Sequence, residues 1–421
     1  MAKAGSFKRK GAEMKRKCKH IDITNPDTIR EWVADCIRRH KKRYDFREML
    51  FQYGMSQKDY GTCIEEHNNS LLLPTVEKII TEVCRQLRER SLELKPVRIR
   101  EQKDKTTGKI RMIGCEPPMQ QIFDYIAVYS CQDIWNSRLV LQQCSSVPGR
   151  GQIYGMKMLR RYIVSDNRAI RYARKHRDRY TSKCKYVVKL DVKKCFPSAR
   201  LEIFMELFKH DCGNNTILWL WEQLFRTHRI NGYEGFMIGS LISQWACQYM
   251  LSFIYNEAMS ITYMKRGEKH RAVSHMVMFM DDMALFGSNR TQLLKTVRHL
   301  FTFAREKLGF ELKPNFAIQP LGQIDMMGYV IYRKGTVSIR ARNYIKARRL
   351  KLRYKGRGTL SLRQAKRLTS YKGFFVHSGY NKGGMSEAFR TAQKIISIKE
   401  KRNGKGNICR TAGKNLLPQA S

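Results

Sequence analysis

The chain has 421 residues, of which 42% are hydrophobic and 28% charged, so it can bury a substantial core and is not a disordered chain. Lysine and arginine number 81 against 36 acidic residues, and the formal net charge of +45 indicates a polyanionic partner, nucleic acid ahead of an acidic membrane surface. No apolar run reaches the roughly 18 residues of a membrane span, and no apolar stretch follows the basic N-terminus as it would in a secretory signal. The twelve cysteines form no Cys-x-x-Cys pair, which argues against a zinc site and a disulfide framework and fits a reducing cytosol.

The hydrophobic pattern predicts an α+β fold. Apolar residues at helical spacing predict helices at 72–92, 201–210, 240–258 and 301–308, the last one stopped by Gly309. Apolar runs bounded by turn residues predict a short buried strand at 185–190 and two hairpins, at 273–286 and 324–339. Strands and helices mix without the regular alternation that builds a parallel α/β sheet, so we expect an α+β core.

Basic residues concentrate in three segments. Residues 1–20 carry a net charge of +7 and residues 340–421 a net charge of +20, which together supply 27 of the 45 surplus charges. Residues 159–185 hold ten Lys or Arg with three interleaved tyrosines, and such rings suit unstacked bases while the cations suit phosphates. A single basic run is equally well explained as a solvated helix face, but three on one chain favour RNA or DNA as the partner.

Three carboxylates stand at the ends of apolar segments. Asp281 and Asp282 form the tip of the predicted 273–286 hairpin, and Asp191 ends the predicted 185–190 strand. Taken alone, the adjacent pair reads more often as a β-turn, and Asp191 as a helix N-cap or an ion pair. If the strand pairs with the hairpin, Asp191 and Asp281 converge and can hold two divalent ions, which oxygen-only ligands indicate to be Mg²⁺.

At these residues the sequence resembles the reverse transcriptases. Residues 185–198 (KYVVKLDVKKCFPS) are similar to the first palm motif, an Asp followed five residues later by an aromatic residue, and 279–282 (FMDD) to the aromatic-x-Asp-Asp motif. Residues 108–114, 324–329 and 370–375 resemble the triphosphate-binding finger segment, the primer-grip hairpin and the thumb. Residues 238–244 (IGSLISQ) stand where most members carry Gln-Gly-x-x-x-Ser-Pro, and Ile238 with Gln244 resembles the reverse transcriptases of diversity-generating retroelements.

The resemblance implies a right-hand polymerase with fingers, a palm containing an antiparallel sheet, and a helical thumb. It covers roughly residues 70–385. The implied domains are a basic N-terminal extension at 1–60, fingers at 61–180 with 206–237 returning to fingers or palm, the palm at 181–330, the thumb at 331–400 and a basic tail at 401–421.

The resemblance also implies a role for each site residue. The metal ligands would be Asp191, Asp281, Asp282 and the carbonyl of Val192, and the three carboxylates would be the catalytic residues. Arg111 and Lys109 would bind the triphosphate, and Phe196 would exclude a 2′-hydroxyl.

Ile238 and Gly239 would lie against the nascent base pair, where Ile in place of Gln loosens the positioning of the base, and Gln244 would be a further substrate-binding residue. Lys313 is the lysine nearest to the family's proton-donor position, which itself falls on Phe316.

The implied function is RNA-directed DNA synthesis with two Mg²⁺ ions. The enzyme would copy template-repeat RNA into cDNA from deoxynucleoside triphosphates, with errors at adenines. It would be cytoplasmic and encoded by a bacterium, an archaeon or a phage. An accessory variability protein oligomer would be its partner, and a membrane would not. Two alternatives stay open: a group II intron or retron-type reverse transcriptase, and a non-catalytic RNA-binding scaffold with a polymerase-like fold.

Overall fold

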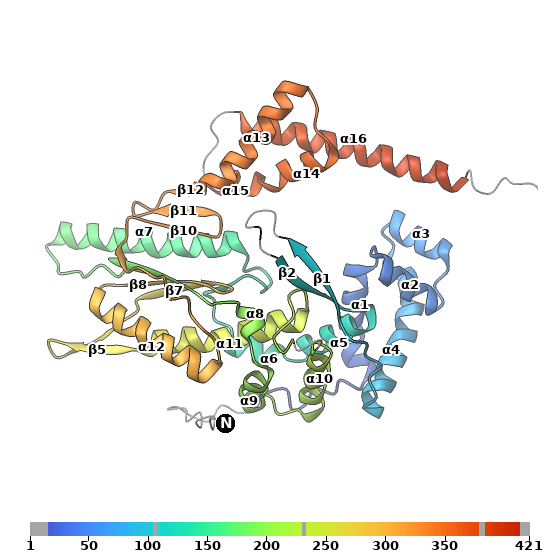
Figure 1. Cartoon of the computed structure of the whole chain (residues 1–421), viewed down its shortest axis with the longest axis horizontal. Coiled ribbons are helices and arrows are strands. Elements are labelled where there is room, and N and C mark those ends of the chain that lie inside the picture. The colour runs from blue at the N-terminus through green and yellow to red at the C-terminus, as the bar shows by residue number, and fades with distance from the viewer. Residues whose placement is uncertain (1–15, 104–107, 109, 230–232, 379–383, 413–421) are drawn as a thin grey trace, which may run out of the picture. The chain divides into compact units, whose positions relative to one another are not determined.

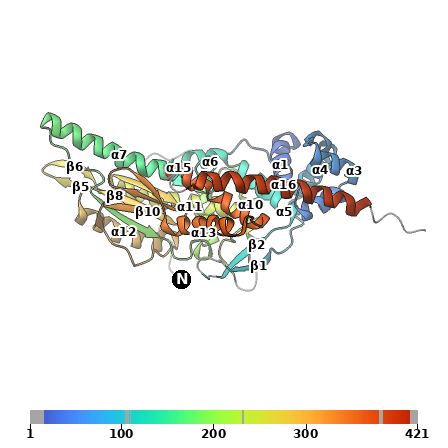
Figure 2. The same ribbon diagram turned by 90° about the horizontal axis from the view of Figure 1, so that it is seen from above.

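The computed structural model describes residues 16–103, 108, 110–229, 233–378 and 384–412. The chain divides into two compact units, each built from two stretches of sequence. Unit 1 comprises residues 1–150 and 188–318, and unit 2 comprises residues 151–187 and 319–421. Figures 1 and 2 show the helices and strands with their labels.

The first half of unit 1 is mostly helical. Its elements are α1 (Pro26–His40), α2 (Tyr44–Gln52), α3 (Gln57–Glu65), the 3-10 helix η1 (Asn69–Leu72), α4 (Leu73–Glu89), the hairpin β1 (Arg98–Lys103) and β2 (Ile110–Cys115), α5 (Pro118–Tyr129), α6 (Gln132–Arg138) and β3 (Gln143–Cys144). The predicted 72–92 helix is confirmed as α4, and its buried stripe packs beside α1. Leu73 begins the helix and is 55% exposed, although it is apolar.

The second half of unit 1 carries the central sheet. Its elements are α8 (Cys195–Ser198), α9 (Leu201–Asp211), α10 (Asn215–Arg226), α11 (Leu241–Ser260), β5 (Thr262–Lys265), β6 (Glu268–Arg271), β7 (His275–Phe279), β8 (Asp282–Gly287) and α12 (Arg290–Leu308). The predicted helices at 201–210, 240–258 and 301–308 are confirmed. The last one starts earlier than expected, at Arg290, because Asn289 caps its N-terminus, and it ends at Gly309 with φ 69°.

The central sheet has the strand order β3-β7-β8-β4, where β4 (Tyr186–Asp191) continues from unit 2 into unit 1. The hairpin β7–β8 is antiparallel, with Met278 opposite Met283 and Phe279 opposite Asp282. Helices α11 and α12 pack against this hairpin, and α11 is apolar nearly all round because it is buried nearly all round. The predicted strand at 185–190 and the predicted 273–286 hairpin are therefore confirmed, but the tip of the hairpin is Met280-Asp281 and not Asp281-Asp282, because Asp282 pairs with Phe279 in the ladder.

Unit 2 begins with the long helix α7 (Gln152–His176), which packs against a three-stranded sheet (Figure 2). The sheet consists of β10 (Gln323–Met326), β11 (Tyr329–Tyr332) and β12 (Val337–Ile339), and β9 (Gln319–Pro320) pairs with the first residues of β4. The second predicted hairpin was wrong in one respect. Its first arm is two strands, because Met327 and Gly328 both have positive φ and turn the chain between them.

The rest of unit 2 is helical, as expected for residues that follow the sheet. Its helices are α13 (Ala341–Arg357), α14 (Leu362–Ser370), α15 (Lys372–Ser378) and α16 (Met385–Ala412). They share one small apolar core, made by Ala347, Leu350, Leu360, Leu368, Phe375, Phe389 and Ala392 among others. None of the described helices in either unit is both long enough and apolar enough to cross a bilayer.

Candidate active site

The tip of the β7–β8 hairpin is a strained turn that is held from two sides. Met280 lies in the left-handed region with φ 52°, a conformation that a non-glycine residue keeps only when its surroundings fix it. Its amide donates to the carbonyl of Cys144, and its sulfur accepts hydrogen bonds from Ser146 and Gln248. These contacts fix Met280 and so set where the next residue, Asp281, leaves the sheet.

Asp281 and Asp191 lie close together, as the pairing of hairpin and strand predicted. The amide of Val192 donates to the carbonyl of Asp281 at 3.3 Å. Burial, and next the negative charge of Asp191, raise the pKa of the Asp281 carboxyl above its ordinary value. The site therefore holds two carboxylates whose mutual repulsion a cation would relieve.

Lys313 supplies one cation to this site. Its Nζ lies 2.6 Å from Oδ1 of Asp191, and its amide donates to the carbonyl of Asp191 at 2.8 Å. The same Oδ1 is buried and receives no hydrogen bond of acceptable geometry, so Lys313 and Asp191 form an ion pair by distance alone. A carboxylate oxygen held in this way has a lone pair left for another ligand.

The carboxylates fit a magnesium site only in part. Within the described ranges, no group of three or more His, Cys, Asp or Glu side chains is close enough to hold an ion without substrate. Mg²⁺ is commonly held by one or two carboxylates together with substrate phosphates, and Asp191 with Asp281 matches that pattern. Asp282 is the first residue of β8, opposite Phe279, and is half-buried. In the backbone pairing around Val192, the carbonyls of Asp191 and Glu311 accept hydrogen bonds. The carbonyl of Val192, the expected metal ligand, is not part of that pairing.

Phe196 is joined to the loop that carries Ile238. It lies in the short helix α8 and is half-buried. The amide of Phe236 donates to its carbonyl at 2.9 Å, and a Cβ on Gly235 would lie 2.4 Å from the carbonyl of Pro197. Only glycine permits this approach, so α8 packs directly against the backbone just before Ile238.

Strand β2 contacts Ile238 and Gly239. The amide of Gly114 donates to the carbonyl of Ile238 at 2.8 Å. Gly239 has φ 109°, and a Cβ there would lie 2.8 Å from the carbonyl of Gly114. Side chains two apart on a strand share a face, so Arg111 lies on the same face of β2 as Ile113, whose side chain borders Gly239.

The structure thus brings Phe196, Ile238, Gly239 and Arg111 to neighbouring backbone positions. Gln244 is half-buried in the first turn of α11, where its amide donates to the carbonyl of Ser240. Lys109 lies outside the described residues.

A buried polar cluster beneath these segments was missed by the sequence analysis. Glu116 follows β2 and lies 3.2 Å from Nε2 of His228. Asp124 of α5 is fully buried, and neither of its carboxyl oxygens has a hydrogen-bond partner of acceptable geometry. Burial, and next the charge of Glu116, raise the pKa of Asp124 well above its ordinary value. No local motif marks this cluster, because His228 lies more than a hundred residues from Glu116 and Asp124 in the sequence.

The fold and the site together define a template-directed nucleic-acid polymerase of mixed α and β structure. Residues 101–316, just over half of the chain, match the reverse transcriptase (RNA-dependent DNA polymerase) family. The chain belongs to the reverse transcriptase family, which confirms the predicted fold class and the predicted enzyme class, RNA-directed DNA polymerase.

Solved telomerase structures are similar to the chain at low identity. Telomerase from Candida tropicalis with the TWJ fragment of telomeric RNA is 11% identical, with 97% of this chain and 79% of that chain covered and a TM-score of 0.45. Telomerase from Candida albicans with the TWJ fragment is 11% identical, with coverage of 77% and 65% and a TM-score of 0.41. Apo telomerase from Candida tropicalis truncated from its C-terminal domain is 13% identical, with coverage of 58% and 54% and a TM-score of 0.42. The last two matches span less than two thirds of those telomerase chains. No curated protein matches the chain.

Proposed function

We propose that the chain is the reverse transcriptase of a diversity-generating retroelement, which copies template-repeat RNA into cDNA with frequent errors opposite adenines. The observation that carries the proposal is Ile238 at the bend beside Gly239. Its carbonyl accepts a hydrogen bond from the amide of Gly114 on β2, and the residue is half-buried. An apolar side chain there offers no hydrogen bond that would fix a base, so mispairs are rejected less strongly.

The reaction is nucleotidyl transfer. The primer 3′-oxygen forms a bond to the α-phosphorus of the incoming nucleotide, the bond to the β-phosphate oxygen breaks, and pyrophosphate leaves. Arg111 binds the triphosphate with a guanidinium suited to bidentate phosphate contact. Phe196 would set a flat ring against the sugar and exclude a 2′-hydroxyl, and Gly239 would let the backbone approach the new base pair closely.

Asp191 and Asp281 would hold the two divalent ions, with Asp282 and the carbonyl of Val192 assisting. When bound, such ions lower the pKa of the 3′-hydroxyl and stabilise the leaving pyrophosphate. Before they bind, Lys313 offsets the charge of Asp191 across 2.6 Å. In this proposal Lys313 would also hold a proton for the leaving pyrophosphate.

The enzymatic part of the proposal is tested by primer extension. The wild-type chain should extend oligo-dT on poly-rA in Mg²⁺, and Asp281→Asn should reduce extension by at least about a thousandfold, because it removes a charge that metal binding needs. Asp133→Asn, an exposed acid on α6, is the matched control and should extend normally. Wild-type chain that extends nothing, even with an accessory partner supplied, would support the RNA-binding scaffold instead.

The retroelement part is tested by fidelity. On a mixed-sequence RNA template, the wild-type chain should make errors mainly opposite adenines, and Ile238→Gln should lower that error rate several-fold while errors opposite other bases change little. Sequencing of the cDNA gives both rates. Errors spread evenly over all four bases, or unchanged by Ile238→Gln, would favour the group II intron or retron-type alternative.

The remaining parts of the proposal concern partners and location. Template RNA, cDNA and an accessory variability protein oligomer would bind the basic chain, whose charge of +45 attracts acidic surfaces. A reducing cytoplasm of a bacterial or archaeal host is proposed because the cysteines from Cys18 to Cys247 are free.

A further inference from the structure

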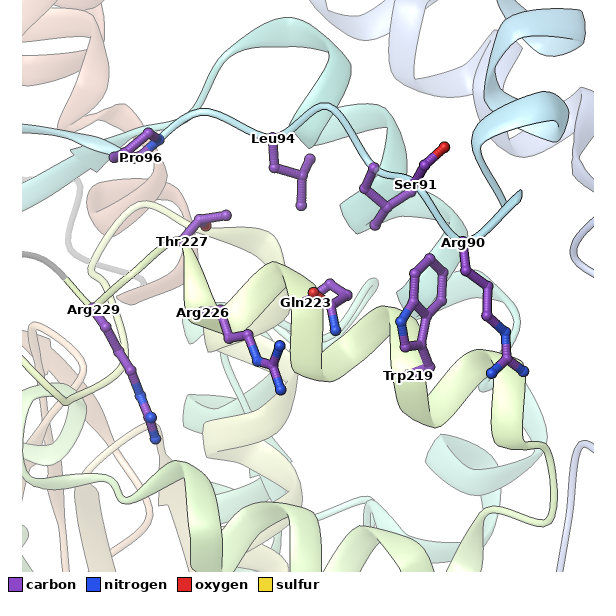
Figure 3. Close-up of a pocket in the computed structure, with 10 residues that line it drawn as sticks. Arg90, Ser91, Leu94, Pro96, Trp219, Gln223, Arg226, Thr227 and Arg229 are labelled. Atoms are coloured by element: carbon purple, nitrogen blue, oxygen red, sulfur yellow. The ribbon is translucent and has the colours of Figure 1, made fainter. Parts of the chain in front are cut away.

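A surface pocket in unit 1 lies apart from the catalytic carboxylates. It has a volume of about 410 Å³ and lies between α10 and residues 90–96, the segment that links α4 to β1. Figure 3 shows Trp219, Gln223 and Arg226 along α10, with the segment that carries Ser91 and Leu94 passing alongside. None of the residues assigned to the catalytic site lines it.

The pocket is a built feature of the fold. Trp219, Gln223 and Arg226 are four and three residues apart, so they share one face of α10. The opposite wall is tied to the end of that helix, because the amide of Val97 donates to the carbonyl of Thr227 at 3.3 Å. Gln120 of α5 donates to the Thr227 hydroxyl at 2.6 Å, which fixes the helix end further.

The charge of the pocket is positive. Arg90, Arg226 and Arg229 line it, and no acidic residue does so among its described lining. Arg226 pairs with Glu222 at 2.8 Å and Arg229 pairs with Glu202, but both acids lie outside the lining and all four side chains are at least 42% exposed. Such exposed pairs contribute little, so a phosphate can displace them.

Trp219 supplies a flat ring within this basic setting. It is half-buried, and the guanidinium carbon of Arg90 lies 5.8 Å from the centre of its ring. An aromatic ring between arginines suits an unstacked base, with the cations on the flanking phosphates. Trp219 and Arg226 are about 10 Å apart along the helix axis, at 1.5 Å per residue, so a ligand that reaches both is longer than a lone phosphate.

We propose that this pocket binds single-stranded nucleic acid, with one base stacked on Trp219 and the adjoining phosphates held by Arg226 and Arg229. A duplex fits poorly because its bases are already stacked on one another. The site would hold an unpaired stretch of RNA while the residues around Asp191 and Asp281 engage the primer and template. It extends the proposed function and does not depend on catalysis.

The test is a binding measurement on the full chain with the proposed catalytic site occupied. The chain is saturated with an RNA–DNA primer–template duplex, and a fluorescent eight-nucleotide single-stranded RNA is titrated in and followed by anisotropy. Trp219→Ala should weaken this second binding by about 5- to 150-fold, the range for loss of one stacked base. Trp219→Phe should restore most of it, and Arg226→Gln with Arg229→Gln should weaken it and flatten its salt dependence.

Control variants and a second ligand keep the outcome clear. Arg298→Gln with Arg305→Gln on the exposed side of α12 removes the same charge elsewhere and should leave the second binding unchanged. Equal losses in these controls and in the pocket variants would overturn the proposal, as would wild-type affinity in Trp219→Ala. A mononucleotide that competes as well as the eight-nucleotide strand would show a nucleotide site and would also overturn it. The measurement needs no polymerase activity, so its failure is distinct from failure of the proposed function.

Discussion

Asp124 is a residue whose burial makes a sharp prediction about pH. Its folded pKa lies well above the unfolded value, first because it is buried and next because Glu116 is near, so the folded protein holds the proton more tightly than the unfolded chain. This contribution to stability is fully present below about pH 4 and is lost as pH rises toward the folded pKa. Asp124→Asn removes the titration. The free energy of unfolding of Asp124→Asn should therefore rise relative to that of wild type by about 1.4 kcal/mol for each pH unit between about pH 4 and the folded pKa of Asp124.

Urea unfolding at intervals from pH 4 to pH 8 measures this gain. The exposed Asp133→Asn variant should track wild type at every pH. A difference between Asp124→Asn and wild type that is independent of pH, or that shrinks as pH rises, would contradict the assignment of a protonated Asp124.

Gly239 combines a strained backbone conformation with a position in the proposed nucleotide site. Alanine there would be strained at φ 109°, and its Cβ would lie 2.8 Å from the carbonyl of Gly114, so strand β2 would have to shift with Arg111 on it. Because displacements of about 1 Å can cost a hundredfold in rate, Gly239→Ala should lower kcat/KM for a nucleotide at least tenfold. Single-nucleotide incorporation measures this value.

Gly267→Ala is the control, because it introduces the same kind of backbone strain as Gly239→Ala without a steric clash. Gly267 has φ 79° in the β5–β6 turn, and a Cβ there would meet nothing within 4 Å. It should keep the wild-type kcat/KM, and an equal loss in both variants would refute the role given to the Gly239–Gly114 contact.

These residues also show what sequence can reveal about a site. Asp191 and Asp281 could be singled out because each sits in a short motif, an apolar strand ending in an acid. Asp124 could not, because an acid inside the apolar stretch 118–129 gives no hint that Glu116 and His228 lie next to it. The left-handed Met280 was equally hidden, since the contacts from Cys144 and Gln248 that hold it are distant in sequence.

At the scale of elements, one buried acid joins α7 to the rest of unit 2. Asp166 on α7 accepts hydrogen bonds from the Tyr180 and Ser182 hydroxyls and pairs with Arg333 at 2.9 Å. Burial alone would raise the pKa of Asp166, but the hydrogen bonds from Ser182 and Arg333 outweigh it and lower the pKa below its ordinary value. Asp166→Ala leaves Arg333 without its charge partner and should destabilise the chain by about 3 kcal/mol at neutral pH.

The pH dependence of that loss has a definite sign. A lowered folded pKa stabilises the protein above about pH 4, and this stabilisation disappears as pH falls through the folded pKa. The gap between wild type and Asp166→Ala in chemical unfolding should therefore narrow in acid. Asp178→Ala, an exposed acid just past the end of α7, should stay within about 0.5 kcal/mol of wild type. A gap that widens in acid would contradict the ion pair.

The same scale shows why some elements were predicted and others were not. The hairpin at 273–286 and the helix at 240–258 have long apolar runs, and runs of that kind are read reliably. The apolar residues at 324–332 predict one strand of the second hairpin and hide the turn between β10 and β11. The isolated Gly328 within this stretch nevertheless indicates a turn or bulge. The start of α12 was missed because its first turns are polar, although Asn289 has the character of an N-cap.

At the scale of the whole molecule, the surplus charge is unevenly placed along the chain. Helix α13 in unit 2 presents Arg348, Arg349 and Arg353 as exposed side chains, and only Ala347 and Leu350 of that helix are buried. Such a helix is suited to contact the phosphates of a duplex. These contacts need exposed cations and do not depend on the base sequence. The basic composition alone predicted nucleic acid as the partner, but it could not say which cations of a given helix are exposed.

The charge of α13 makes a prediction about salt. Binding of an RNA–DNA duplex should weaken steeply as salt rises, because each neutralised phosphate releases a counterion. Changing Arg348, Arg349 and Arg353 to Gln should lower affinity at low salt and reduce the slope of log K against log salt by about 1 for each phosphate that the variant no longer neutralises. Gln at Lys295, Arg298 and Arg305 on α12 removes the same charge and should leave that slope near wild type. Anisotropy of a labelled duplex between 50 and 300 mM salt gives both slopes, and equal slopes for the two triple variants would mean that α13 contacts no phosphate.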